Sequence, residues 1–469
     1  MKSKQPIPVR TFVTMNIFFL VGFTTILFGG LTTYEGITVS MLALVGCTLI
    51  VLQQTTGELF SFSVLFLLFS YIMHLGHPLL LSLGYDKVLG FDQRGYTTPE
   101  IYMRACQFSA KAQFWLMLGM MVGSLKTYRL RTTDILRISD GDLNKNYLQK
   151  TYTVGLDLFF ITLLPRVYVD LSKIVLYLLG GYLKTYSLNV NGYILVLARM
   201  LDLAVLVMMV ASKNNKRRAR WWMLGMCAYH FLFMMTGNRG DAVMRIIVML
   251  LVYSKIFPSR NLSLGKVIGG ICGIWISVAI LSALGTLRLD GMTLQQFYNE
   301  IVKNLFGEPA VLKIFSEFGV TIKTVCFAIE TFPQIHPYSY GMNYIKGSLA
   351  FLPNIGGFIT NSIKELVYVY YFRNRSVIGG SYIGELYYAF GQIGYLLAAF
   401  IGFFVSRIDF IRIAAQLSQN WKKFLVSIVF ITPCIWWIRD YYYTCVREIV
   451  MSIVALFILY KMQIVLKKK

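Results

Sequence analysis

Long apolar segments recur along the whole chain, and they constrain its fold more than any single motif does. Each segment has about 20 residues, the length at which an α-helix crosses the hydrocarbon core of a bilayer. Of the 469 residues, 56% are hydrophobic and only 14% are charged, and the mean hydropathy is +0.60. Because backbone polar groups inside a bilayer must bond to one another, the sequence predicts an all-α polytopic integral membrane protein.

We expect about twelve transmembrane helices in a single integral membrane domain over residues 1–469. One long connection, residues 287–381, separates the ninth span from the tenth. The predicted spans cover residues 11–30, 37–54, 59–84, 101–125, 152–178, 193–212, 221–236, 241–254, 267–286, 382–405, 424–438 and 446–464.

The distribution of Lys and Arg predicts the orientation. Lys2, Lys4 and Arg10 precede the first span. The even-numbered connections carry clusters of basic residues, over residues 126–137, 213–220, 255–266 and 406–423. Since positive residues collect in cytoplasmic connections, we expect both termini in the cytoplasm. The connection at 55–58 has no basic residue and does not bear on this topology.

The net charge of +23 has the same explanation. The basic residues flank apolar spans, where anionic lipid headgroups attract them, so membrane lipids rather than nucleic acid are the expected partners. The seven cysteines are scattered without a CxxC pair, and the four histidines have no metal-ligand spacing. The sequence therefore predicts no metal site and no cofactor.

The connection over 287–381 is predicted to lie on the outer face and to be partly helical. Apolar residues recur at helical spacing in 292–307, which predicts an amphipathic helix at the membrane interface. A second helix is expected over 309–329. His336 follows in an irregular stretch and is a candidate proton-transfer group. Folded loops of this length usually carry function.

Arginines gather at the predicted outer face. Arg239 and Asp241 lie in the connection 236-TGNRGDAVMR-245, where a guanidinium could fork onto phosphate oxygens beside the free N–H groups of the next helix. The alternative is a solvated turn with Asp241 as a helix N-cap. The other arginines at this face are Arg288, Arg373 and Arg375. Together the four arginines predict a pyrophosphate site.

Charged residues also stand inside the predicted spans. Arg166 and Asp170 are four residues apart on one helix, and Arg199 and Asp202 are three apart on the next. Such residues either neutralise one another within or between helices or line a polar cavity. On the second interpretation, Arg166 is a candidate substrate-binding residue.

The predicted span 101–125 carries two further cations, Arg104 and Lys111. Seven residues are close to two helical turns, so both side chains lie on one face of the helix. A cationic stripe of this kind indicates a wet interior rather than a surface that faces lipid.

The carboxylate of Glu385 stands near the start of the tenth predicted span, in 379-GGSYIGELYYAFGQIGYL-396. This stretch follows a loop that contains 344-YIKGSLAFLPN-354. The combination resembles the oligosaccharide repeat-unit polymerases of bacterial O-antigen and capsule assembly (Wzy-type), in which a serine and a Gly-Glu precede a tyrosine-rich span. The GNRGD connection also fits the resemblance.

The resemblance implies a glycosyltransferase-type polymerase in the bacterial cytoplasmic (inner) membrane. It implies that, at the outer face, a growing glycan passes from undecaprenyl pyrophosphate to the sugar hydroxyl of the next lipid-linked repeat unit. The product would be O-antigen or capsular polysaccharide. A separate co-polymerase that controls chain length is a further partner that the resemblance suggests.

Such a transfer requires binding of pyrophosphate and activation of the acceptor hydroxyl. Glu385 could activate the acceptor or orient an arginine. The candidate catalytic residues are Glu385, Arg239 and Arg288. The candidate substrate-binding residues are Arg373, Arg375, Asp241, Tyr382, Tyr387, Tyr388, His336 and Arg166. The three tyrosines could stack on sugars or belong to the aromatic belt of the membrane interface.

Two other functions remain as alternatives. An O-antigen ligase also uses lipid-linked glycan, but the ligase loop pattern of His, seven residues and Glu-Gly is absent after His336. A lipid-linked oligosaccharide flippase would have a similar number of spans and basic interior residues. The long outer loop favours the polymerase over the flippase, because a transporter is expected to have short connections.

Overall fold

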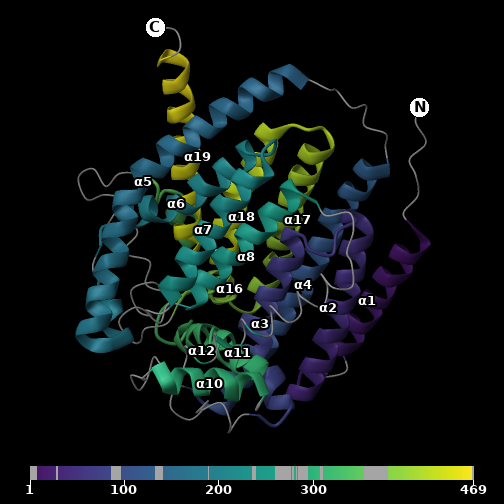
Figure 1. The fold of residues 1–469 in the computed structure, drawn as a ribbon. Helices are drawn as coiled ribbons and strands as arrows, with labels where there is room; N and C mark the ends of the chain where they lie inside the picture. Colours follow the sequence, from purple (N-terminus) through teal and green to yellow (C-terminus); the bar gives the residue numbers. More distant parts are fainter. Residues whose placement is uncertain are drawn as a thin grey trace. The chain divides into compact units, whose positions relative to one another are not determined.

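The computed structural model describes residues 8–27, 30–85, 97–132, 141–188, 190–234, 239–258, 276, 279–280, 283, 294–306, 310–352 and 379–466. All regular structure in these ranges is helical (Figure 1), as the all-α prediction requires. Contacts divide the chain into two compact units, residues 1–139 with 315–447, and residues 140–314 with 448–469. The single integral domain stays a prediction.

The first unit is built around α4, which packs on α2, α3, α12 and α17. Its N-terminal helices α1 and α2 lie side by side (Figure 1). The helices that lie in this unit or begin or end in it are α1 (Val9–Leu27), α2 (Tyr34–Thr56), α3 (Phe62–Ser82), α4 (Pro99–Thr132), α11 (Ala310–Gly319), α12 (Ile322–Thr331), α13 (Met342–Ser348), α16 (Tyr382–Phe390), η4 (Gly391–Leu397), α17 (Ala398–Leu417), α18 (Trp421–Trp437) and α19 (Tyr442–Leu466).

Glycines allow α4 and α17 to approach closely. A Cβ added to Gly119 would overlap the Ala399 carbonyl oxygen, and one added to Gly402 would overlap the Leu116 carbonyl oxygen. The hydroxyl of Ser406 donates across the same interface to the carbonyl of Met120 at 2.8 Å. Small residues and interhelical hydrogen bonds are the usual means of helix association where hydrophobic driving force is weak.

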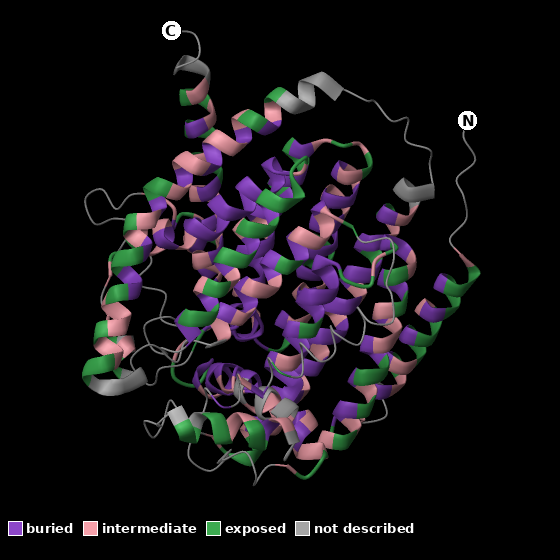
Figure 2. Ribbon diagram, in the orientation of Figure 1, coloured by how far each residue is buried: buried purple, intermediate pink, exposed green. Residues whose placement is uncertain are grey.

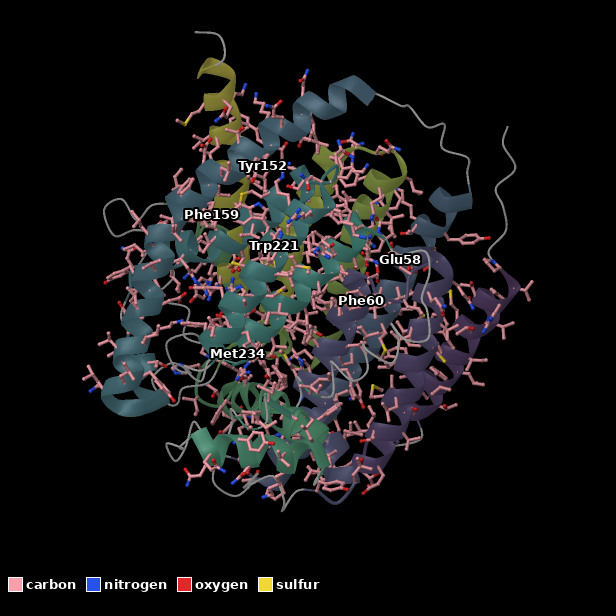
Figure 3. All side chains as sticks on the ribbon, in the orientation of Figure 1. Glu58, Phe60, Tyr152, Phe159, Trp221 and Met234 are labelled. Carbon is pink, nitrogen blue, oxygen red and sulfur yellow. The ribbon has the colours of Figure 1, made fainter. Side chains whose placement is uncertain are left out.

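The second unit pairs the long helix α5 with α6, which in turn contacts α7 and α8. The described helices of this unit are α5 (Gly141–Lys184), η2 (Thr185–Ser187), α6 (Gly192–Ala211), α7 (Lys216–Met234), α8 (Arg239–Ile256), α10 (Leu294–Phe306), and the parts of α11 and α19 outside the first unit. Aromatic residues contribute to the packing: the Trp222 indole donates to the Tyr152 hydroxyl at 3.3 Å and its ring lies 5.5 Å from that of Phe159. Figure 3 labels both α5 residues.

Five helices of the described chain are long and apolar enough to cross a membrane: Val9–Ile26, Tyr34–Thr56, Phe62–Ser82, Gly192–Ala211 and Tyr442–Gln463. Apolar side chains on α1 remain exposed, Phe23 among them, and Figure 2 shows exposed residues along this helix. Such side chains suit contact with lipid. The total of about twelve spans stays a prediction, and most of the predicted span 267–286 lies outside the described residues.

The predicted span 382–405 is helical but is not one uninterrupted α-helix. α16 ends at Phe390, the 3₁₀ helix η4 follows, and α17 begins only at Ala398. Gly391 has φ +61° and ψ −142°, a conformation essentially restricted to glycine. A Cβ at Gly394 would overlap the Leu386 carbonyl oxygen, so close backbone packing also bends the chain here.

The predicted helices of the long connection are found with one difference. α10 occupies the region predicted as an amphipathic helix over 292–307. The helix predicted over 309–329 is instead two helices, α11 and α12, which meet after Gly319. A Cβ at Gly319 would lie 2.7 Å from the His77 ring, so the helix ends where α3 packs against its backbone.

An ion cluster joins two connections of the first unit that the topology prediction assigns to the same side. Arg412 donates to Glu58, labelled in Figure 3, at 3.2 Å and to Asp409 at 3.0 Å. Asp409 also accepts from the Ser63 amide at 2.7 Å. The pKa of Asp409 is lowered although its burial acts to raise it, because Arg412 and Ser63 favour the charged form. The side that this end faces stays a prediction.

Candidate functional site

α16 begins inside the motif that carries Glu385. Ser381 is its N-cap, and the serine hydroxyl accepts from the Gly384 amide at 3.2 Å. Directly before the cap, a Cβ at Gly380 would lie 2.5 Å from the carbonyl carbon of Asp440. The paired glycines of the motif therefore allow two backbones to come into contact.

The Glu385 carboxylate is buried and bonded on both oxygens. Glu385 is only 4% exposed. The Trp437 indole donates to Oε2 at 3.0 Å, and the backbone N–H of Tyr442 donates to Oε1 at 3.1 Å and Oε2 at 3.0 Å. The donors are the last residue of α18 and the first residue of α19, so Glu385 ties α16 to the segment 437–442 where these two helices are joined.

Arg439 lies on the segment that Glu385 holds. Its carbonyl oxygen would meet a Cβ at Gly379 at 3.0 Å, and the residue is half-buried. Within the described ranges its guanidinium makes no ion pair or hydrogen bond. A guanidinium that belongs to no ion pair remains able to bind an anion.

A closed polar network lies behind the N-terminus of α16. His74 Nδ1 donates to the Ser70 carbonyl at 3.0 Å, and its Nε2 lies 2.7 Å from the Ser381 hydroxyl. The Ser70 hydroxyl lies 2.7 Å from the Tyr382 hydroxyl and accepts from Gln113 at 2.5 Å. All five residues are buried, so the network holds α3 and α4 to α16 and is closed to solvent.

The tyrosines of α16 face protein rather than solvent. Tyr387 is buried, with the Phe108 ring 5.0 Å and the Tyr338 ring 6.1 Å from its own. Tyr388 is buried against Phe332, at a ring distance of 4.5 Å. Aromatic pairs at these distances contribute to packing. Tyr387 and Tyr388 form the buried side of an aromatic cluster with Phe108, Phe332 and Tyr338. The accessible members of this cluster come from other segments.

Tyr338 is one of the accessible members. Burial raises the pKa of Tyr338 to about 12, while the nearby Arg104 acts in the opposite direction. The phenol therefore stays neutral at physiological pH and can donate a hydrogen bond. Its ring lies over Gly391, where a Cβ would come within 2.7 Å of the Tyr338 Cζ atom. The unusual backbone of Gly391 thus makes room for this ring.

The second unit contains a different cluster, centred on Asp202. Arg245 Nη1 donates to Asp202 Oδ2, His230 Nε2 lies 2.6 Å from Asp202 Oδ1, and Arg166 Nη1 lies 3.9 Å from Oδ2. Arg166 also pairs with Asp170 at 2.6 Å. All these residues are buried.

The same cluster includes Asp241, which accepts from Arg245 Nε at 2.5 Å. Asp241 lies in the first turn of α8, where a carboxylate interacts favourably with the helix dipole. The alternative in which Asp241 is the helix N-cap is therefore wrong, because α8 begins two residues earlier, at Arg239. Arg199 pairs with Glu448 at 3.6 Å, so each of these arginines faces a carboxylate.

The family model for O-antigen polysaccharide polymerase Wzy matches residues 10–469, nearly the whole chain. The chain belongs to this family. The resemblance drawn from the sequence is thereby confirmed. As a Wzy polymerase, the protein is a multi-pass membrane enzyme that transfers glycosyl groups in O-antigen repeat-unit polymerisation, with lipid-linked oligosaccharides as substrates. Comparison with curated proteins and with solved structures gave no significant match.

Several residues predicted for the Wzy site cannot be placed. Arg288, Arg373 and Arg375 lie outside the described residues, and Arg239 begins α8 but its side chain is not described. The four-arginine pyrophosphate site stays a prediction. His336 is half-buried, with its ring 6.5 Å from that of Phe332. In the described ranges, no group of three His, Cys, Asp or Glu residues could hold a metal ion.

Sequence reasoning missed two parts of the site, His74 and the segment that carries Arg439. The signal for His74 was a polar side chain in an otherwise apolar span. The signal for Arg439 was its place in the last connection, which the predicted topology puts on the outer face. Both lie far from α16 in the sequence and come into contact with it only in the folded protein.

Proposed function

We propose that this Wzy polymerase joins repeat units carried on undecaprenyl pyrophosphate into O-antigen or capsular polymer at the outer face of the cytoplasmic membrane. The observation that carries the proposal is the family match over residues 10–469. Support for the outer face comes from the distribution of Lys and Arg, which predicts cytoplasmic termini. A chain-length co-polymerase is a proposed partner.

The reaction is a glycosyl transfer without a nucleotide sugar. The acceptor hydroxyl oxygen bonds to the anomeric carbon of the donor sugar, while the bond from that carbon to the pyrophosphate oxygen breaks. The released undecaprenyl pyrophosphate keeps the electron pair of the broken bond, and the hydroxyl proton passes to a base or to solvent. Cations that stabilise the leaving pyrophosphate are therefore the main requirement.

We assign this stabilisation to arginines at the predicted outer face. Arg239 and Arg288 stay proposed as catalytic, with Arg373 and Arg375 as binding residues, on the basis of charge and predicted position. His336 stays a proposed proton-transfer group. Arg166 and Asp241 are buried or paired within the cluster around Asp202, so we propose that they shape the second unit rather than contact substrate.

Glu385 is proposed as a positioning residue for Arg439 rather than as the acceptor base. Both of its oxygens accept from Trp437 and Tyr442, which leaves the carboxylate engaged with protein. The segment it fixes carries Arg439, whose guanidinium has no partner among the described residues. Tyr382 and Tyr387 are likewise buried supports, so we do not assign them to sugar stacking.

A double-mutant cycle tests this assignment. The variants are Glu385→Ala, Arg439→Ala and the double variant, assayed with purified enzyme and a lipid-linked repeat unit. If Glu385 acts through Arg439, the double variant will be about as slow as Arg439→Ala alone. Arg439→Lys is the matched control that retains charge. Fully multiplicative losses in turnover would show that the two residues act independently.

A strain that lacks the gene tests the function itself. Surface glycan is separated on a gel, and the glycan on the lipid carrier and on the core is identified chemically. Collapse of the ladder to a single repeat unit on the outer side, restored by the wild-type gene, is the expected result. Repeat units trapped at the cytoplasmic side would indicate a flippase, and full-length polymer still on its carrier would indicate a ligase.

A further inference from the structure

Two half-buried cations of α4 lie on one face of the helix. Arg104 and Lys111 are separated by about 10 Å along the helix axis, since each residue rises about 1.5 Å. Phe108 stands between them, four residues after Arg104 and three before Lys111, and therefore lies on the same face. By the predicted topology this face lies in the outer half of the span.

Neither cation is neutralised by a carboxylate within the described part of the chain. Lys111 Nζ lies 5.7 Å from the centroid of the Tyr395 ring, within the range of a cation–π contact. Arg104 acts electrostatically on the Tyr338 phenol. A half-buried cation that faces rings instead of carboxylates keeps its charge available to an anionic ligand.

Aromatic residues from two other segments surround this face. The Phe108 ring lies 5.0 Å from Tyr387 and 6.1 Å from Tyr395. Tyr395 and Tyr338 are half-buried, and Tyr340, whose ring lies 6.3 Å from that of Tyr338, is 75% exposed. Two cations beside rings that are partly accessible form a surface that matches a sugar bearing phosphate. Rings cover the apolar face of the sugar, and the cations pair with the phosphate oxygens.

We propose that Arg104, Lys111, Tyr338 and Tyr395 bind the pyrophosphate-linked sugar of the substrate. This inference rests on the proposed function, which supplies a substrate of that chemistry. A phospholipid headgroup has the same phosphate chemistry but lacks the pyrophosphate, and anionic headgroups are always present in the membrane. The test must therefore separate these two sources of phosphate.

The probe is farnesyl pyrophosphate, which is added to the purified full-length protein in neutral detergent, with the dissociation constant measured by calorimetry. We expect the double variant Arg104→Gln with Lys111→Gln to bind about tenfold more weakly or worse, because two charge-assisted contacts are lost. Arg104→Lys with Lys111→Arg retains both charges and should bind nearly as wild type. Tyr395→Leu should weaken binding less than the loss of both cations.

The control variant removes the same charge elsewhere. Arg217→Gln with Arg220→Gln changes two exposed cations of α7 and should leave the dissociation constant unchanged. Farnesol, which lacks phosphate, should bind wild type and the double variant equally. Equal affinity of the double variant and wild type for farnesyl pyrophosphate would overturn the proposal. Displacement of the probe by phosphatidylglycerol at equal concentration would also overturn it, because the site would then take headgroups.

The binding result and the glycan ladder can fail separately. If the deletion strain keeps its ladder while farnesyl pyrophosphate still depends on Arg104 and Lys111, the proposed function fails and this site stands. If the ladder collapses while the double variant binds normally, the function stands and this site fails. Elution of each variant as wild type in gel filtration establishes that it is folded, and the separate variants Arg104→Gln and Lys111→Gln serve if the double variant does not fold.

Discussion

The charges around Asp202 and those around Glu385 differ in their partners. Asp202 is buried among Arg245, His230 and Arg166, so opposite charges face one another. Glu385 is equally buried, but its bonded partners are the neutral N–H groups of Trp437 and Tyr442.

Two cations of the first unit differ in the same way from the arginines of the second. In the second unit Arg166, Arg199 and Arg245 each face a carboxylate. In the first unit Arg104 and Arg439 have no such partner among the described residues. Buried pairs of opposite charge satisfy one another, and removing one member leaves a charge in a poor environment. Arg412 of the first unit is paired in this way with Glu58 and Asp409. Arg104 and Arg439 are not, and their charge is left available, which suits an enzyme whose proposed substrate is anionic.

The largest expected effect is the loss of Asp202. Asp202→Ala would leave Arg245 and Arg166 buried without this carboxylate and should destabilise the protein by about 3–5 kcal/mol. The measurement is thermal unfolding in detergent. Asp157→Ala is the control, since Asp157 is half-buried and accepts one hydrogen bond from Gln463 at 2.7 Å. Equal unfolding temperatures for the two variants would contradict a paired, structural role for Asp202.

A smaller loss is expected at Glu385. Glu385→Ala removes the acceptor of the buried Trp437 indole and of the partly buried Tyr442 amide. A buried donor left unsatisfied costs about 1–3 kcal/mol, and the partly buried one costs less. Glu385→Gln keeps one acceptor oxygen and should lose less. Hydrogen exchange at the Tyr442 amide is the direct measurement, and it should become faster in Glu385→Ala. Unchanged exchange there would show that the carboxylate does not hold the segment 437–442.

The next effect on stability is expected at Gly391, which packs against Tyr338 of the aromatic cluster. Gly391→Ala places a side chain at φ +61°, which costs about 1–2 kcal/mol, and its Cβ would press on Tyr338. Gly225→Ala, on α7 of the second unit, meets no atom within 4 Å and should stabilise the protein by up to about 1 kcal/mol. Thermal unfolding of both variants tests the contrast, and shifts of the same sign would contradict it.

The smallest effect on stability is expected for the cations of α4. Arg104→Gln and Lys111→Gln should each change the free energy of unfolding by no more than about 0.5 kcal/mol, because neither residue belongs to an ion pair among the described residues. Thermal unfolding beside Asp202→Ala gives the comparison. A loss of stability as large as that of Asp202→Ala would show that Arg104 and Lys111 stabilise the fold. It would contradict the contrast between paired and available cations.

Several features of the fold could be predicted from the sequence because they are local. A run of apolar residues determines whether a segment can cross a bilayer, and α2, α3 and α6 lie where the hydropathy placed them. The amphipathic pattern of 292–307 likewise predicted α10. The interruption at Gly391 was missed because a glycine in an apolar run does not reveal its backbone conformation.

The roles of the charged residues depended on contacts that sequence patterns do not encode. Glu385 meets partners 52 and 57 residues away, and Asp202 meets Arg245 at a separation of 43. His74 reaches Ser381 across 307 residues. By itself the sequence determined a helical membrane protein of the Wzy family, since hydropathy, basic connections and the motif at Glu385 are all read along the chain. Only the tertiary structure decided which charges are paired and which are left available, because a hydrogen bond depends on where distant helices bring their side chains together.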